Sequence, residues 1–591
     1  MKPMLDKKFG IPLALLLNIQ NVAQMIGIVL IAVVRVKLRF PPLKVISIAL
    51  ILSSIAMLFL AAPEWVNFET PQCESLQGRN ASSANSTLSQ WAEKSCVLEK
   101  KRAFHDQLIC NIHDRRNSSS PKLSSWEERQ TNIYALVLFG IGQCLAGFSS
   151  APFITIAFYH VYEECSKRKE EENQPSLLLG ILTAIYLTGP YISQPFIESI
   201  PWLQKSWIGF CVCGGVYALT AIFMFFLSTK NESLTEKTAQ TETLMLSSQS
   251  EHLENTPVTE KGLLSCCLRE LWTNLELCSK RKFLTMSSAW TLNTYIFTEY
   301  QQHLSEFIRI EYGTPHEMAV IYTGVHSFFS IALPLVIGGC AMSRLGSFST
   351  GKLKSTVKWM GIFWFIICLA FTAVIFCGCP EPTIEDTNTE GNASSCLASC
   401  DCDSVTQIYP VNFNGKNFRT PCHAGCIDFD PFSNIWSNCK CVGYSSISTG
   451  LAYSNCKNLV LYLVITGVGL FVGNLVFITP MMTILKDAPV KKGLFALCLA
   501  TSLGQLLHIL GFITSLIFPA PIKLTCILMS NGHSEDDENC VLQDNLWFTS
   551  LFHGVPVGFQ VLALYLVYLY YISPSEQEDI PMTERNRELS D

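Results

Sequence analysis

The sequence has little charge. Only 15% of its 591 residues are Asp, Glu, Lys or Arg, whereas a soluble globular chain carries about 25%. Hydrophobic residues make up 49% of the chain. A chain with this composition is expected to have lipid as its main solvent.

Several chemical signatures are also missing. No block of Lys and Arg is long enough to indicate a nucleic-acid partner, and the formal net charge is −6. The sequence has no glycine-rich phosphate loop, no cluster with metal-ligand spacing and no nucleophile triad. These absences argue against an ATP-driven pump and a membrane enzyme, and we expect neither a cofactor nor a metal ion.

Long apolar runs are abundant. Crossing about 30 Å of hydrocarbon takes roughly 20 mostly apolar residues. In the first run, polar residues at 18, 20, 21 and 24 and the lack of a small-residue cleavage pattern favour a span over a signal peptide. Eleven predicted spans exclude a seven-span receptor. They lie at 9–34, 42–63, 132–160, 176–199, 206–228, 283–304, 318–341, 357–378, 458–484, 493–519 and 546–572.

Charge and glycosylation signals predict the same orientation. Lys and Arg cluster between alternate spans, for example at 35–44, 167–169, 280–282 and 486–492, which by the positive-inside rule places these segments in the cytoplasm. The intervening loops contain Asn-x-Ser/Thr sequons, the acceptors of extracellular glycosylation. The predicted glycosylation sites are Asn80, Asn85, Asn117 and Asn392.

Polar segments divide the chain into two membrane halves. The segment 229–262 is rich in Ser, Thr and Glu and is expected to be a flexible linker; its sequon at Asn231 is predicted to stay unused in the cytoplasm. The predicted parts are an N-terminal half at 1–228 with five spans and an extracellular loop at 66–131, a cytoplasmic linker at 229–282, three spans at 283–378, an extracellular Cys-rich domain at 379–457, three spans at 458–572 and a cytoplasmic tail at 573–591.

Cysteine is concentrated in one loop. Ten of the 25 cysteines lie between positions 377 and 456. Zinc binding is the competing interpretation of the Cys-x-Cys pairs at 400–402 and 439–441, but oxidising conditions outside the cell favour disulfides, and a loop with few apolar residues needs cross-links. The last outer loop adds Cys526 and Cys540. The predicted disulfide cysteines are Cys396, Cys400, Cys402, Cys422, Cys426, Cys439, Cys441 and Cys456.

One stretch of this loop resembles a known family. The sequence CLASCDCDSVTQIYPVNFNGKNFRTPCHAGC at 396–426 is similar to the Kazal-like loop of the organic anion transporting polypeptides, which are solute carriers of the major facilitator superfamily. Similar stretches are KKFGIP at 7–12, LLLGI with TGP at 177–190, SWIGF at 206–210, and HILGFI at 508–513 after KKGLFALCL.

The resemblance implies a fold and a function. The expected fold is an all-α membrane bundle in two halves, with twelve helices in the family and a small disulfide-rich loop between the ninth and tenth. The expected function is sodium-independent transport of amphipathic organic anions, such as steroid conjugates, bile acids and thyroid hormones, by alternating access at the plasma membrane. The expected partners are these anions and the lipid bilayer, with no nucleic acid.

The sequence also departs from the family. Aligning KKFGIP places Met1 in the family's first external loop, so the usual first helix is missing and eleven spans are expected. In the signature before the sixth helix only Trp207-Ile208-Gly209 and Gly214 match. The Kazal-like Pro-Val-Cys-Gly becomes Pro-Val-Asn-Phe at 410–413, so Cys377 or Cys379 substitutes for the lost partner or one thiol is free. The alternative function is therefore a transport-inactive surface protein that acts through its extracellular loop.

Polar residues within the spans are the candidates for the substrate path, because they are costly in lipid and usually face the bundle interior. His508 aligns with a basic position of the family and could face an anion, or bond to a neighbouring helix. Glu299 could couple protons or pair with His508. The other candidates are Asn293 and Tyr295, which precede Glu299, and Asn18, Asn21 and Gln24, which recur every three residues and could instead join helices.

Overall fold

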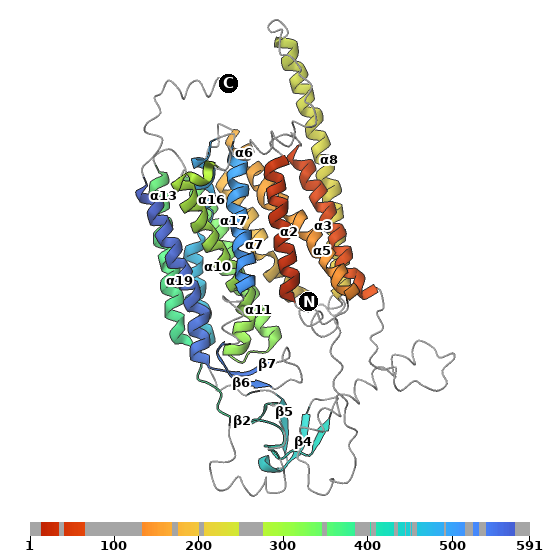
Figure 1. Cartoon of the computed structure of the whole chain (residues 1–591), viewed down its shortest axis with the longest axis vertical. Helices are drawn as coiled ribbons and strands as arrows, with labels where there is room; N and C mark the ends of the chain where they lie inside the picture. The colour runs from red at the N-terminus through yellow and green to blue at the C-terminus, as the bar shows by residue number, and fades with distance from the viewer. Residues whose placement is uncertain are drawn as a thin grey trace, which may run out of the picture.

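The computed structural model describes residues 13–34, 41–65, 133–167, 175–199, 206–246, 276–345, 352–384, 402, 409–430, 435–443, 445–449, 451, 458–489, 492–514, 524–530 and 539–573. Long helices run side by side in a bundle, and a small β-domain lies beyond one end of it (Figure 1). The predicted glycosylation sites Asn80, Asn85, Asn117 and Asn392 lie outside the described residues, as do Cys396, Cys400 and Cys456.

The N-terminal half is a group of helices in which α3 packs against α5 and α8, and α2 packs against α5. A π-helical turn, η4, interrupts one span between α5 and α6. Its helices are α2 (Leu13–Val34), α3 (Pro42–Trp65), α5 (Ile133–Pro152), η4 (Phe153–Ala157), α6 (Phe158–Lys167), α7 (Pro175–Ser199) and α8 (Ser206–Leu246).

The C-terminal half is built around α10, which packs against α11, α16, α17 and α19. Its core is aromatic, with Tyr300, Trp364, Phe371 and Tyr462 each fully or almost fully buried. Its helices are α10 (Arg281–Glu311), α11 (His316–Ser327), the π-helical η6 (Phe328–Ala332), α12 (Leu333–Leu345), α13 (Leu353–Val374), α15 (Asn458–Asn474), α16 (Thr479–Asp487), α17 (Gly493–Thr514) and α19 (Asn545–Ile572).

The helices match the predicted spans. Among the described residues, ten segments are long and apolar enough to cross a membrane, and they coincide with ten of the eleven predictions. The eleventh, 283–304, forms the helix α10 but is too polar to meet the same criterion, since it contains Asn293, Glu299 and His303. The chain is thus a multi-pass membrane protein.

The linker differs from the expectation. Helix α8 does not end with its apolar span at Thr229 but continues to Leu246 and projects beyond the bundle (Figure 1). The segment 230–246 contains no Pro or Gly, so nothing interrupts the backbone hydrogen bonds, and Glu, Lys, Gln, Leu and Ala all favour a helix. The first part of the predicted linker, up to Leu246, is therefore helical.

The two halves meet through small residues. A Cβ atom at Gly180 of α7 would lie 2.6 Å from the Leu335 carbonyl oxygen of α12, and one at Gly339 would lie 2.6 Å from that of Ser176. Glycine is required for such a close backbone approach. A second contact joins α2 and α17, where Ile28 and Cys498 are buried together. These two contacts form a seam between the halves.

The β-domain contains a five-stranded antiparallel sheet in the order β2-β1-β5-β4-β3. Asn414 and Gly415 join the first two strands with φ angles of 49° and 82°, the conformation of a two-residue hairpin turn. The strands are β1 (Val411–Phe413), β2 (Lys416–Phe418), β3 (Asp428–Asp430), β4 (Ile435–Cys439) and β5 (Ser445–Thr449). A separate hairpin pairs β6 (Cys526–Ser530) with β7 (Asn539–Gln543).

The β-domain has both disulfides and a small core. Disulfides join Cys402 to Cys422 and Cys426 to Cys439, and Cys441 is also disulfide-bonded. Trp436 is fully buried and its ring lies 4.5 Å from that of Phe429, so the domain has more of its own core than the sequence suggested. Outside the β-domain, the disulfide Cys526–Cys540 closes the β6–β7 hairpin.

Polar contacts fix the point where α13 leads into the β-domain. The Cys379 amide donates to Glu311 Oε1 at 2.8 Å, and the Asn545 side chain donates to the Cys379 carbonyl at 3.3 Å. The Asn458 side chain, at the start of α15, donates to the Gly378 carbonyl at 3.2 Å. Cys379 is disulfide-bonded and Cys377 is a free thiol. The start of the β-domain is thus held against three helices.

Candidate functional site

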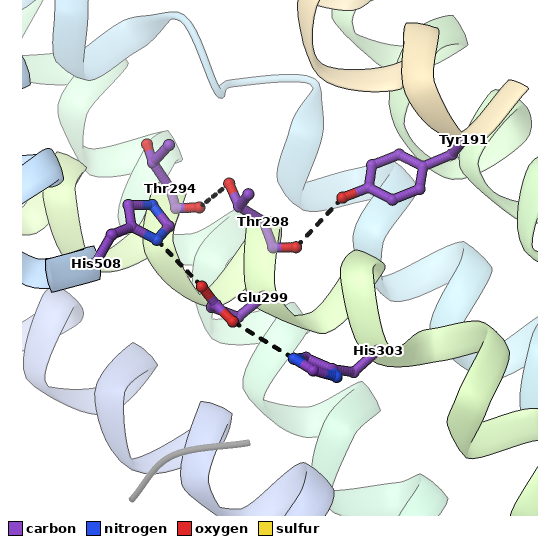
Figure 2. A network of polar contacts seen from close by, with 6 residues as sticks. All are labelled: Tyr191, Thr294, Thr298, Glu299, His303 and His508. Atoms are coloured by element: carbon purple, nitrogen blue, oxygen red, sulfur yellow. Dashed lines mark hydrogen bonds and ion pairs between the residues drawn. The ribbon is translucent and has the colours of Figure 1, made fainter. Parts of the chain in front are cut away.

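Glu299 lies between two histidines. Its Oε1 atom is 3.1 Å from Nδ1 of His508 on α17, and its Oε2 atom is 3.7 Å from Nε2 of His303, four residues later on α10 (Figure 2). The first distance is that of a hydrogen bond and the second that of an ion pair without one. The side chains are between 16% and 24% exposed, so the group is neither sealed in the core nor open on the surface.

Aromatic side chains surround this group. The Tyr295 ring lies 4.8 Å from the His508 ring in an edge-on arrangement, and its centroid is 6.3 Å from that of Phe559 on α19. From the N-terminal half, the Tyr191 hydroxyl of α7 lies 3.5 Å from the Thr298 carbonyl oxygen, next to Glu299 (Figure 2). Residues of both halves therefore meet at this site, which we call the Glu299 site.

Among the described residues, the titratable side chains near Glu299 lie on helices α7, α10 and α17. Helix α17 contributes His508, α10 contributes His303 and Tyr295, and α7 contributes Tyr191, while α2 contains no titratable residue. Helix α16 ends near the first residues of α10, away from Glu299. There, Asp487 accepts a hydrogen bond from Tyr570, and Lys282 lies over the Tyr570 ring. Within the described part of the chain, no Lys or Arg forms an ion pair with Glu299.

The structure brings together three of the predicted residues. Glu299, His508 and Tyr295 are in contact, and pairing of Glu299 with His508 was one of the two alternatives considered. Asn293 is buried on α10, at 5% exposed, but within the described residues it makes no hydrogen bond to Glu299 or His508. Gln24 of α2 is buried at 5% exposed, and Asn18 and Asn21 are half-buried on the same helix, which packs against α5 and α17.

Two features were missed. His303 has the i, i+4 spacing from Glu299 that places two side chains on one helix face, so its signal was present in the sequence. A second polar network, inside the C-terminal half, joins residues far apart in sequence and gave no local signal. It connects Tyr300, Tyr462, His553, Thr466 and His326, all of them buried.

In the second network, the donor and the acceptor of each hydrogen bond can be assigned. His553 Nδ1 is 3.0 Å from the Thr549 carbonyl oxygen, and because a carbonyl only accepts, Nδ1 bears the proton. A neutral ring then accepts at Nε2 from the Tyr462 hydroxyl, at 3.2 Å, and Tyr462 in turn accepts from Tyr300 at 2.8 Å. This series of hydrogen bonds ends on a backbone carbonyl inside the C-terminal half, so it links α10, α15 and α19 to one another.

The Glu299 site combines groups that can bind ions and protons. It offers two imidazoles to an anion and one carboxylate to a cation or a proton. In the described ranges, no group of three His, Cys, Asp or Glu side chains is arranged to hold a metal ion.

Comparison with known proteins identifies the family. The sequence profile of the Organic Anion Transporter Polypeptide (OATP) family matches residues 3–548. The chain belongs to this family. Its members are transporters, which indicates that this chain is not an enzyme. The helical bundle in two halves, with a disulfide-bonded β-domain, confirms the predicted fold class.

The relatives are distant. Solute carrier organic anion transporter family member 4C1 of Mus musculus is 24% identical over 82% of this chain and 70% of its own length. Member 1B1 of Homo sapiens is 22% identical over 77% of this chain and 72% of its own. A bacterial homologue of the iron transporter ferroportin, in an outward-facing state, aligns over 95% of this chain and 94% of its own, with 12% identity and a TM-score of 0.40.

Proposed function

We propose that this protein carries amphipathic organic anions across the membrane without sodium, by alternating access. The substrates in view are steroid conjugates, bile acids and thyroid hormones. Family membership supports organic anions as the general class. The named substrates are those that the family resemblance implies. The site offers what such molecules need, because an anionic group requires a positive partner and an apolar body packs against aromatic rings such as Tyr295 and Phe559.

One observation supports the proposal most directly, the contact between Glu299 and His508. It lies where α17, which packs on α2 of the other half, meets α10. In alternating access the two halves rock about a central site, so an anion site is expected at such a seam. A protonated His508 would bind the anionic group of the substrate.

Uptake tests the proposal. Cells expressing the chain are expected to accumulate a labelled steroid sulfate at least threefold above cells without it, with no change when external sodium is replaced by choline. The protein at the cell surface is quantified in parallel by biotinylation. Uptake at background level, with normal surface amounts, would contradict the proposal and favour a transport-inactive surface protein that acts through its β-domain.

A second prediction concerns orientation. We propose that the β-domain and the loop 66–131 lie outside the cell and that α8 ends inside it, because sequons and Lys/Arg clusters segregate between alternate spans. Replacing Asn80, Asn85, Asn117 or Asn392 by Gln is expected to lower the glycosylated mass at each occupied site, whereas Asn231→Gln leaves it unchanged. A mass shift from Asn231→Gln on an immunoblot would show that this segment is glycosylated outside the cell and that the proposed orientation is wrong.

A further inference from the structure

The Glu299 carboxylate contacts the two histidines in the way that the carboxylate or sulfate of an organic anion would contact them. One carboxylate oxygen faces His508 at 3.1 Å and the other faces His303 at 3.7 Å (Figure 2). A substrate carboxylate or sulfate also offers two oxygens along one edge. Both imidazoles keep some exposure, 16% and 24%, so neither is sealed off from a competing anion.

The two contacts are not equivalent. His303 lies four residues from Glu299 on α10 and stays near it whatever the helices do, because i and i+4 share a helix face. His508 lies on α17, so only the contact with His508 joins two helices. It is also the shorter contact. A substrate that takes His508 would therefore separate an interhelical pair and leave Glu299 beside His303.

We propose that Glu299 is an internal substitute for the substrate anion. In the empty carrier it binds His508; when the substrate binds His508, Glu299 keeps His303 as its partner. This inference rests on the proposed function, since it assumes that the same site transports an anion. His303 is accordingly a positioning residue, and His508 is the residue that contacts the substrate.

The physical reason lies in the empty carrier. To return without substrate, the halves must close over the site and remove it from water, and an imidazolium enclosed without an anion is strongly disfavoured. Glu299 supplies that anion from within the chain. During exchange the carrier returns with a substrate anion in the site, so Glu299 is not needed. Without Glu299 the empty carrier closes only after the imidazole has released its proton, so net uptake is expected to slow in its absence, whereas exchange is not.

The nearby groups are consistent with this role. The other titratable side chains that face Glu299 are Tyr191 of α7 and Tyr295 of α10, and phenols are neutral at physiological pH. Among the described residues, no Lys or Arg forms an ion pair with Glu299 that could replace the histidines. The charge of the site is therefore set by one carboxylate and two imidazoles.

The test compares net uptake with exchange in Glu299→Gln, which keeps the shape of the side chain and removes its charge. A labelled steroid sulfate is offered to cells that are either substrate-free or preloaded with the unlabelled compound. Net uptake is expected to fall at least tenfold, exchange to stay within threefold of wild type, and the half-saturating concentration in exchange to fall severalfold because no carboxylate competes for His508. Glu306→Gln is the matched control.

Glu306 lies two turns along α10 and pairs with Arg309 instead, so its variant is expected to behave as wild type in both assays. His303→Gln is an independent variant: Glu299 loses its second partner, so the half-saturating concentration is expected to rise about tenfold while the ratio of net uptake to exchange stays unchanged.

Two results would overturn the inference. One is a Glu299→Gln variant in which net uptake and exchange fall together or both remain at wild-type levels, at normal surface amounts. The other is a His303→Gln variant whose half-saturating concentration is unchanged or lower, which decides the matter even if Glu299→Gln fails to reach the surface. Absence of both uptake and exchange in wild type would instead refute the proposed function on which the inference stands.

Discussion

Replacing His508 by Ala is expected to lower steroid sulfate uptake tenfold to about a hundredfold at pH 6 and to abolish its dependence on external pH. A hydrogen bond to a charged group contributes about 1.5–3 kcal/mol, which corresponds to this range of rates. His508 is the histidine in hydrogen-bonding contact with Glu299 across two helices. Its loss removes the positive partner of the substrate anion.

The sign of the pH effect follows from the charge. An imidazole attracts an anion only when it is protonated, so wild-type uptake is expected to rise as external pH falls. His508→Arg keeps a positive charge at every pH and should retain high uptake at pH 8, where the wild type is slow. The measurement is uptake against pH from 5.5 to 8.5, corrected for surface protein.

Competing sources of pH dependence can be separated. His316, exposed at the first residue of α11, is the control, and His316→Ala should keep the wild-type profile. If Glu299 were the titrating group, exchange by Glu299→Gln would lose its pH dependence, whereas we expect it to persist. An unchanged pH profile in His508→Ala would show that the imidazole does not set the charge of the site.

The site was only partly predictable because its members come together in different ways. His303 and Glu299 are four residues apart, so helix periodicity alone places them on one face. His508 and Glu299 are 209 residues apart, and only the packing of α17 on α10 joins them; the sequence offered that pair as one alternative of two. His553 and Tyr462 are fully buried inside the C-terminal half, where nothing local distinguishes a structural histidine from a functional one.

The fold was more predictable, because hydrophobic length reports directly on the bilayer. Helix α10, predicted as the span 283–304, is more polar than the other spans, but it packs against α11, α16, α17 and α19 and so needs less apolar surface. One difference from the prediction has a physical cause. The span at 458–484 divides into α15 and α16, where Pro480 lies in the first turn of the second helix and prevents a continuous hydrogen-bond pattern.

Cys422→Ser is expected to reduce the amount of protein at the cell surface at least fivefold. Cys422 is fully buried and bonded to Cys402, 20 residues earlier. Loss of a native disulfide from a small domain typically costs about 2–5 kcal/mol, and a core as small as that around Trp436 and Phe429 provides little stability beyond this. The β-domain would then be largely unfolded, and an unfolded domain exposes apolar residues and free thiols that retain a protein before the surface.

Loss of the Cys402–Cys422 disulfide is expected to weaken the second disulfide as well, because of where Cys422 lies. It lies in a tight turn in which the Cys426 amide donates to the Pro421 carbonyl at 3.0 Å, and Thr420 Oγ1 bonds His423 Nδ1 at 2.7 Å. The same turn therefore positions Cys426 for its disulfide with Cys439. A serine at 422 releases the turn from Cys402, so the second disulfide is expected to form less completely as well.

Surface biotinylation relative to total protein measures the effect, with free thiols counted by alkylation and mass spectrometry. Cys213→Ser is the control, because Cys213 is a free, exposed thiol on α8, and its variant should reach the surface normally. Normal delivery of Cys422→Ser would mean that the sheet and its aromatic core hold the domain without the cross-link.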